Sequence, residues 1–161
     1  MEEKAIFTSD GLKLQAVLHR PQGPGSRPAF MVLHGFGGNK DGGGTIASCR
    51  LLAKLGSAAL RFAFRGCGES EGPRGRTICL EQVADVRNAL TWLATQPGID
   101  PARIGVMGHS FGAAVAVYSA GVEPRIAACI SSGGWGDGAK KFRRQHASPE
   151  AWKAFVDMME E

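Results

Sequence analysis

The sequence predicts an α/β protein built on a mostly parallel sheet with helices on both faces. Short apolar runs typical of buried strands alternate with longer segments of helical periodicity, which is the order that a parallel sheet produces. Two strand-like runs open the chain, and the dipeptide Asp10-Gly11 between them is a strong hairpin signal. We therefore expect about six strands, of which the first two are antiparallel.

Each expected strand is a short run rich in apolar residues and bounded by glycine, proline or polar residues. The expected strands cover residues 4–9, 13–21, 29–35, 57–66, 103–110 and 125–134. A glycine-rich loop, GFGGNKDGGG, follows the third of these, and the loop CGESEGPRGR follows the fourth.

Four segments show helical spacing or helix-end signals: 45–56, 77–95, 111–121 and 148–161. Gly56 suits the residue just after a helix, and Pro97 stops the second segment. In the last segment Ser148 is a good N-cap and Pro149 a good first residue. Its apolar stripe is formed by Trp152, Phe155, Val156 and Met159.

Length and composition indicate one globular domain. The 161 residues are 43% hydrophobic and 21% charged, with a net charge of +4. The acidic N-terminus and the lack of a long apolar run predict a cytoplasmic protein with neither a signal peptide nor a membrane partner. We expect a core over 1–135, then a basic loop and a terminal amphipathic helix over 136–161. That helix either packs on the core, which we favour, or begins a lid over the site.

The stretch GVMGHSFGAA, residues 105–114, contains the main functional signal. A serine between two glycines, preceded by a strand and followed by a helix, is typical of a nucleophile held on a sharp turn. Gly108 and Gly112 remove side chains that would collide with the neighbouring elements, and Ser110 begins a helix whose dipole favours negative charge. Ser110 is therefore the candidate nucleophile, and the alternative is an ordinary glycine-serine turn.

A second motif, His34-Gly35-Phe36-Gly37-Gly38, follows the third strand, and with the Ser110 turn it resembles the α/β-hydrolase superfamily. LRFAFRGCGESEG, residues 60–72, resembles the loop of feruloyl-esterase-like and serine-aminopeptidase-like members, RFDFRGHGxSxG. Ala63 and Cys67 stand where that pattern has aspartate and histidine. The resemblance implies an acyl-transfer mechanism in which the backbone N–H groups of Phe36 and Phe111 form the oxyanion hole.

The triad acid and base are harder to find, because the superfamily places both after the serine. The 29 residues after Ser132 leave no room for the seventh and eighth strands that the resemblance implies. Asp137 and His146 are in the right order and are the candidate acid and base within this chain. We expect the last strands of the fold to be missing, so that the sixth strand is a bare edge. Such an edge is expected to pair with itself or with a complementary chain, or to aggregate.

Other polar residues are expected to be structural. His34 and His109 belong to the two turns, and His19 is expected to be exposed. Asp85 is expected to face solvent on its helix, and Asp100 to lie in a turn. The basic run KKFRR, 140–144, is expected to be a solvated face rather than a nucleic-acid site.

The sequence thus favours a serine hydrolase acting on small carboxylic esters, with a non-catalytic binding module on the same scaffold as the alternative. Phe36, Phe111 and Trp135 suggest an apolar acyl or aryl pocket, or ordinary packing. The four cysteines lack metal-ligand spacing and are expected to be free thiols. No metal or cofactor is expected, since ligand-spaced clusters and the GK[ST] of a phosphate-binding loop are absent from the sequence.

Overall fold

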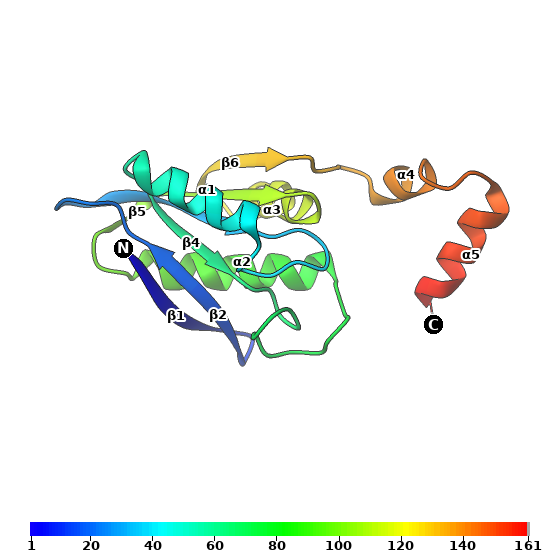
Figure 1. The fold of residues 1–161 in the computed structure, drawn as a ribbon, viewed down its shortest axis with the longest axis horizontal. Helices are drawn as coiled ribbons and strands as arrows, with labels where there is room; N and C mark the ends of the chain where they lie inside the picture. The colour runs from blue at the N-terminus through cyan, green and yellow to red at the C-terminus, as the bar shows by residue number, and fades with distance from the viewer. Residues whose placement is uncertain (161) are drawn as a thin grey trace.

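A computed structural model describes residues 1–160, with side chains as far as Asp157. Its six strands form one sheet in the order β1-β2-β4-β3-β5-β6 (Figure 1). The strands are β1 (Glu2–Ser9), β2 (Leu12–His19), β3 (Arg27–Leu33), β4 (Ala58–Phe62), β5 (Ile99–His109) and β6 (Ile126–Ser132). The β1–β2 and β2–β4 pairs are antiparallel, and the remaining three pairs are parallel. The predicted fold class is confirmed.

Three helices cover the sheet. They are α1 (Gly43–Lys54), α2 (Cys79–Ala94) and α3 (Phe111–Val122). One core cluster joins the sheet to α2 and α3, and a smaller cluster on the other face joins it to α1 through Cys49 and Leu52. The central strands are therefore buried on both faces, as their continuous apolar runs predict.

Local backbone conformations agree with the turn and cap signals of the sequence. Asp10 and Gly11 have φ values of 48° and 84°, the left-handed conformation that a tight hairpin requires. Gly56, just after α1, has φ 86°, and its N–H bonds to the Ala53 carbonyl. The turns thereby set the register of the sheet and the end of α1.

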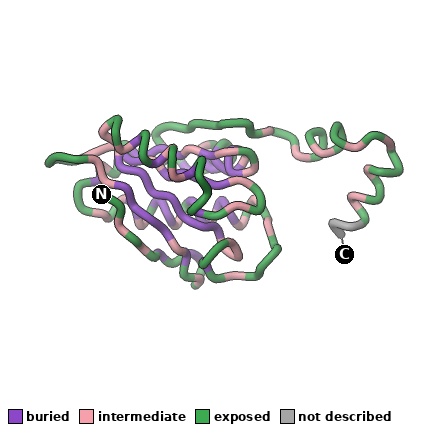
Figure 2. Tube along the Cα trace, in the orientation of Figure 1, coloured by how far each residue is buried: buried purple, intermediate pink, exposed green. Residues whose placement is uncertain are grey.

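β6 lies at the edge of the sheet and is mostly exposed. Figure 2 shows β6 exposed along almost all of its length, whereas β3 and β4 are largely buried. β6 is paired on one side only, with β5. The expected bare edge strand is present in the described residues.

Two further helices, α4 (Gly138–Arg143) and α5 (Pro149–Glu160), stand apart from the sheet (Figure 1). α4 was not predicted from the sequence. The Ser148 hydroxyl accepts a hydrogen bond from the Ala151 N–H at 3.2 Å, as its N-cap role predicts. The expected Met159 contact and residue 161 lie outside the described side chains and residues. The division at residue 135 stays a prediction.

Candidate active site

Ser110 occupies the sharp turn between β5 and α3. Its φ and ψ are 53° and −120°, a conformation that L-residues rarely adopt. The Ser110 N–H bonds to the Ser132 carbonyl at 2.9 Å, and the Ser110 carbonyl accepts from the Ala113 N–H at 3.0 Å. The turn is thus fixed on both sides, and Ser110 is exposed at the sheet's carboxyl edge.

The flanking glycines permit the close packing of this turn. A Cβ on Gly108 would overlap the Gly112 carbonyl, and a Cβ on Gly112 would overlap the His34 carbonyl. Gly35 packs directly against Ser110, with its ideal Cβ position 3.8 Å from the Ser110 Oγ. These close approaches bring the loop after β3 next to the serine, as the two sequence motifs imply together.

Ser110→Gly is expected to raise the free energy of unfolding by about 1 kcal/mol, because glycine removes the cost of the left-handed φ. Equilibrium urea unfolding of the two proteins measures the difference. Thr8→Gly, on β1, is the control: its extended backbone gives glycine no relief, so this variant should be destabilised. A loss of stability in Ser110→Gly would show that the serine turn is not strained.

His34 holds the loop that follows β3. Its Nε2 accepts a hydrogen bond from the Phe64 N–H at 3.2 Å, so the proton of the neutral ring is on Nδ1, which donates to the Gly35 carbonyl at 2.9 Å. The Gly38 N–H also bonds to that carbonyl, at 3.1 Å. Since C=O and N–H point in opposite directions across a trans peptide, the Phe36 N–H is turned away from these partners. His34 therefore has a structural role, and its ring is not available as a base.

Stability is expected to fall as the pH is lowered from about 6.5, because two histidines are buried in the neutral form. Burial lowers the pKa of His34, against a raising effect of the hydrogen bond to Gly35. Burial likewise lowers the pKa of His19. The unfolded chain then binds more protons than the folded one, so this stability is complete above the ordinary histidine pKa and is lost below it.

The pH dependence is measured by urea unfolding between pH 7 and pH 5, with a slope of at most about 1.4 kcal/mol per pH unit for each group. His34→Gln should remove part of the slope, whereas Thr8→Gly, which changes no titratable group, should leave the slope unchanged. A slope unchanged in His34→Gln would contradict the neutral His34 described above.

Arg61 anchors the far end of the same loop. Its side chain is only 6% exposed and donates to the Lys40 carbonyl at 2.8 Å, to Asp41 Oδ1 at 2.5 Å and to His19 Nε2 at 2.9 Å. Lys40 in turn bridges Asp41 and Glu69, at 2.7 and 2.9 Å. The expectation that His19 is exposed is wrong: Arg61 and the strand pairing bury it.

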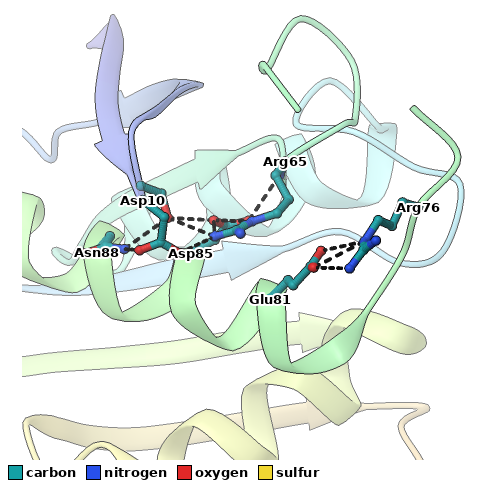
Figure 3. Close-up of polar contacts among 7 residues, drawn as sticks. Asp10, Arg65, Arg76, Glu81, Asp85 and Asn88 are labelled. Atoms are coloured by element: carbon teal, nitrogen blue, oxygen red, sulfur yellow. Dashed lines mark hydrogen bonds and ion pairs between the residues drawn. The ribbon is translucent and has the colours of Figure 1, made fainter. Parts of the chain in front are cut away.

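The loop after β4 is held by a second buried network. Asp85 on α2 accepts a hydrogen bond from the Ser9 hydroxyl at 2.6 Å. It also accepts two from the Arg65 side chain, at 2.7 and 3.0 Å (Figure 3). The Arg65 N–H also bonds to it, at 3.1 Å. The expectation that Asp85 faces solvent is wrong, since it is completely buried. The signal was present in the sequence: Arg61 and Arg65 flank an otherwise apolar strand end and each requires a buried partner.

His109, the residue before Ser110, ties the turn to α1. Its Nε2 lies 3.1 Å from the Ser48 hydroxyl, which donates to the Gly44 carbonyl at 2.9 Å. This contact accords with the structural role expected for His109. Asp100 caps a local turn by accepting from the Ala102 N–H at 3.0 Å.

A row of aromatic rings borders Ser110. The centroid distances are 6.2 Å from Phe36 to Phe111 and 6.1 Å from Phe111 to Trp135. The three residues follow the ends of β3, β5 and β6, and Phe36 is 71% exposed. The structure thus brings the three predicted aromatic residues together at the carboxyl edge of the sheet.

The candidate acid and base are not brought to Ser110. Asp137 caps α4, with its carboxylate accepting from the Lys140 N–H at 2.9 Å, and this contact lowers the pKa of Asp137. The Nδ1 of His146 lies 2.7 Å from the Phe142 carbonyl, and its ring packs 4.7 Å from Phe155. In the described part of the chain, no hydrogen bond joins either residue to Ser110.

A cleft of about 300 Å³ opens beside the aromatic row, between the loops after β3 and β4. Its lining residues are Phe36–Asn39, Gly66–Gly68 and Gly75–Thr77. Among the described residues no group of three His, Cys, Asp or Glu side chains is arranged to hold a metal ion, and no helix is long and apolar enough to cross a membrane. Phe36 lines this cleft, so the cleft adjoins one end of the aromatic row and could receive part of a small molecule.

The sequence profile of the X-Pro dipeptidyl-peptidase (S15) family matches residues 10–159. The chain belongs to this family. It is 38% identical over 133 residues to a thiohydrolase of Aspergillus aculeatus, covering 80% of this chain and 40% of the relative. It is 30% identical over 161 residues to the 2,6-dihydropseudooxynicotine hydrolase of Paenarthrobacter nicotinovorans, covering 99% and 43%.

Among solved structures, an α/β-hydrolase from Penicillium superposes with a TM-score of 0.76 at 27% identity, covering 80% of this chain and 44% of that one. The chain therefore spans less than half the length of these relatives. The comparisons confirm the α/β-hydrolase resemblance and place the chain among hydrolase-like proteins.

Proposed function

We propose that this chain carries the nucleophile and oxyanion hole of a serine hydrolase that acts on small carboxylic esters. The observation that carries the proposal is the positive φ of Ser110, 53°. This backbone conformation costs free energy at any residue other than glycine, and a serine side chain does nothing to reduce that cost. A strained serine exposed at the carboxyl edge of a parallel sheet is typical of a nucleophile.

In the proposed mechanism, Ser110 Oγ attacks the ester carbonyl carbon as its proton passes to a base. The backbone N–H groups of Phe36 and Phe111 bind the resulting oxyanion, each contributing about 3 kcal/mol to its stabilisation. Collapse of the tetrahedral intermediate releases the alcohol, which takes the proton from the base. Water then attacks the acyl-Ser110 ester, releasing the carboxylic acid and restoring the serine.

The base of the proposed mechanism comes from the α4–α5 segment. We propose His146 as base and Asp137 as acid only for a rearranged α4–α5 segment, because each now hydrogen-bonds within its own segment. Their order after Ser110 supports the assignment. If His146 acts, His146→Gln should lower the rate as strongly as replacement of the serine does.

The proposed substrate has an apolar acyl or aryl group. The row Phe36, Phe111 and Trp135 offers rings with exposed faces beside the nucleophile, and the neighbouring cleft is large enough for a small substituent. Phe36→Ala and Trp135→Ala should then lower the rate of hydrolysis of 4-nitrophenyl esters with an aromatic acyl group more than that of the acetyl ester.

Hydrolysis of 4-nitrophenyl esters, compared with an X-Pro 4-nitroanilide, tests the proposal. We expect ester hydrolysis that is lost in Ser110→Ala, with the folded state of the variant verified by circular dichroism. Turnover of the anilide alone would replace esters by peptides as the substrate class. Ester hydrolysis that persists in Ser110→Ala would overturn the proposal.

A non-catalytic module that binds a ligand or partner on this scaffold is the second candidate. The observation that favours it is that Ser110 Oγ has no hydrogen bond to a base among the described residues. This alternative predicts that aryl esters bind without turnover and that Ser110→Ala leaves their affinity unchanged.

A further inference from the structure

A second hollow lies at the end of the sheet opposite Ser110. Ser110 follows the carboxyl end of β5, whereas this hollow, of about 450 Å³, lies where β3 and β5 begin with the facing residues Arg27 and Ile99. Its lining comes from the loop between β2 and β3, the start of β4 and the turn before β5. We call it the basal pocket, and it shares no lining residue with the cleft beside Phe36.

The basal pocket contains an arginine that is partly withdrawn from water without a carboxylate partner. Four arginines of the described residues are buried or half-buried: Arg20, Arg27, Arg61 and Arg65. Three of them each form an ion pair with a carboxylate at 2.5 to 2.9 Å. Arg27 has no such pair within the described part of the chain. A half-buried cation without an anion is electrostatically unfavourable, so this position favours the binding of one.

A backbone carbonyl holds the Arg27 guanidinium in place. Its Nη2 donates to the Pro24 carbonyl at 2.9 Å, while its buried Nε has no hydrogen-bond partner among the described residues. Gly23 has φ 89°, and a Cβ there would lie 3.2 Å from the same Nη2, so glycine lets the loop close on the arginine. A neutral carbonyl fixes the side chain but leaves its positive charge uncompensated.

Arg20 adds a second guanidinium to the lining. Its Nε donates to the Glu3 carboxylate at 2.9 Å and its Nη1 to the Pro97 carbonyl at 2.6 Å. Its Nη2 has no hydrogen bond to a described residue, and no acidic residue lines the pocket. Guanidinium groups match the geometry of carboxylate and phosphate groups, so the two arginines suit an oxyanion.

The remaining side chains of the lining are apolar: Pro21, Pro24, Ala58, Pro97 and Ile99. A volume of about 450 Å³ exceeds what a free phosphate or carboxylate group needs and is typical of a site for a small organic molecule. The pocket thus offers positive charge to one part of a ligand and an apolar wall to the rest.

We propose that the basal pocket binds a small organic anion. Its carboxylate or phosphate group lies against Arg27 and Arg20, and its apolar body packs on the prolines and Ile99. The ligand supplies the negative charge that Arg27 lacks, and its binding stabilises the folded chain. The site does not depend on the proposed ester hydrolysis, because none of its residues belongs to the Ser110 site.

NMR titration of the isotope-labelled 161-residue chain tests the proposal with three probes: benzoate, phenyl phosphate and benzamide, the uncharged analogue of benzoate. We expect benzoate or phenyl phosphate to shift the amide signals of Gly25, Gly98 and Ile99 saturably, with a Kd of about 1 mM or lower. Benzamide should not shift them. The anion that binds more tightly identifies which of the two groups, carboxylate or phosphate, the pocket favours.

Arg27→Gln should weaken the binding of that anion about tenfold or more, because it removes the uncompensated charge. Arg143→Gln is the matched control, since it removes the same charge from an exposed site on α4 that does not line the pocket. It should leave the Kd unchanged. The spectra also show whether each variant is folded, and Arg20→Gln takes the place of Arg27→Gln if the latter is not.

No saturable shift at the basal pocket with either anion up to about 10 mM would overturn the proposal. Equal binding of benzamide would do the same, as would a Kd that the folded arginine variant leaves unchanged or that Arg143→Gln raises as much. None of these results bears on ester hydrolysis at Ser110, which the 4-nitrophenyl esters test separately.

Discussion

Asp85→Ala is expected to lower the free energy of unfolding by about 3–5 kcal/mol, the range typical of breaking a buried ion pair. Asp85 is completely buried, and its carboxylate is the acceptor for Ser9 and for the backbone and side chain of Arg65. Alanine leaves the Arg65 guanidinium, whose side chain is only 12% exposed, without its buried partner. The loop after β4 should then detach from α2.

Glu81→Ala is the matched control, because Glu81 belongs to the same helix and also binds an arginine (Figure 3). Its partner Arg76 is more than half exposed, so the pair should contribute at most about 1 kcal/mol. Urea unfolding of both variants gives the comparison. Equal losses of stability would contradict the assignment of Asp85 as the buried anchor of this loop.

Gly112→Ala is expected to lower stability by about 3 kcal/mol and to displace the loop that carries Phe36. The added Cβ would overlap the His34 carbonyl and approach the Leu33 carbonyl at 2.8 Å. Both atoms are backbone at the end of β3, so they move only if the strand end and the following loop move with them. Any activity that uses the Phe36 N–H should fall with the stability.

Gly121→Ala on the same helix is the control for helix propensity. A Cβ on Gly121 would meet no heavy atom within 4 Å other than those of its chain neighbours and its own helix backbone, so alanine should stabilise the helix by about 0.5–1 kcal/mol. Thermal unfolding distinguishes the two variants by the sign of the change. If Gly112→Ala were as stable as Gly121→Ala, the close packing of the Ser110 turn against His34 would be wrong.

The sequence predicted the strand order along the chain and the position of Ser110 because these depend on local signals. The Asp10-Gly11 turn, the Ser148 cap and the glycines around Ser110 each act within a few residues. The aromatic row was also predictable, since Phe36, Phe111 and Trp135 follow strands that end at the same edge of the sheet.

The sequence did not predict the two buried networks, because their partners are far apart along the chain. His19 meets Arg61 across paired strands, and Asp85 meets Ser9 only through the packing of α2 on the hairpin. Burial of a charged residue cannot be inferred from its own helix or strand when its hydrogen-bond partners lie 20 to 76 residues away, in other elements and loops. The proposed base and acid, His146 and Asp137, are not placed at Ser110 by local signals for a related reason, since they reach it only if α4 and α5 move.

Reaction with a fluorophosphonate probe tests the central claim most directly, because the probe reacts with a serine made nucleophilic by a base. We predict one probe per chain, located on Ser110 by peptide mapping and absent from Ser110→Ala. His146→Gln, labelled in parallel, identifies whether His146 supplies the base. A folded protein that takes up no probe, or takes it up at another serine, would contradict the account of Ser110 as an active nucleophile.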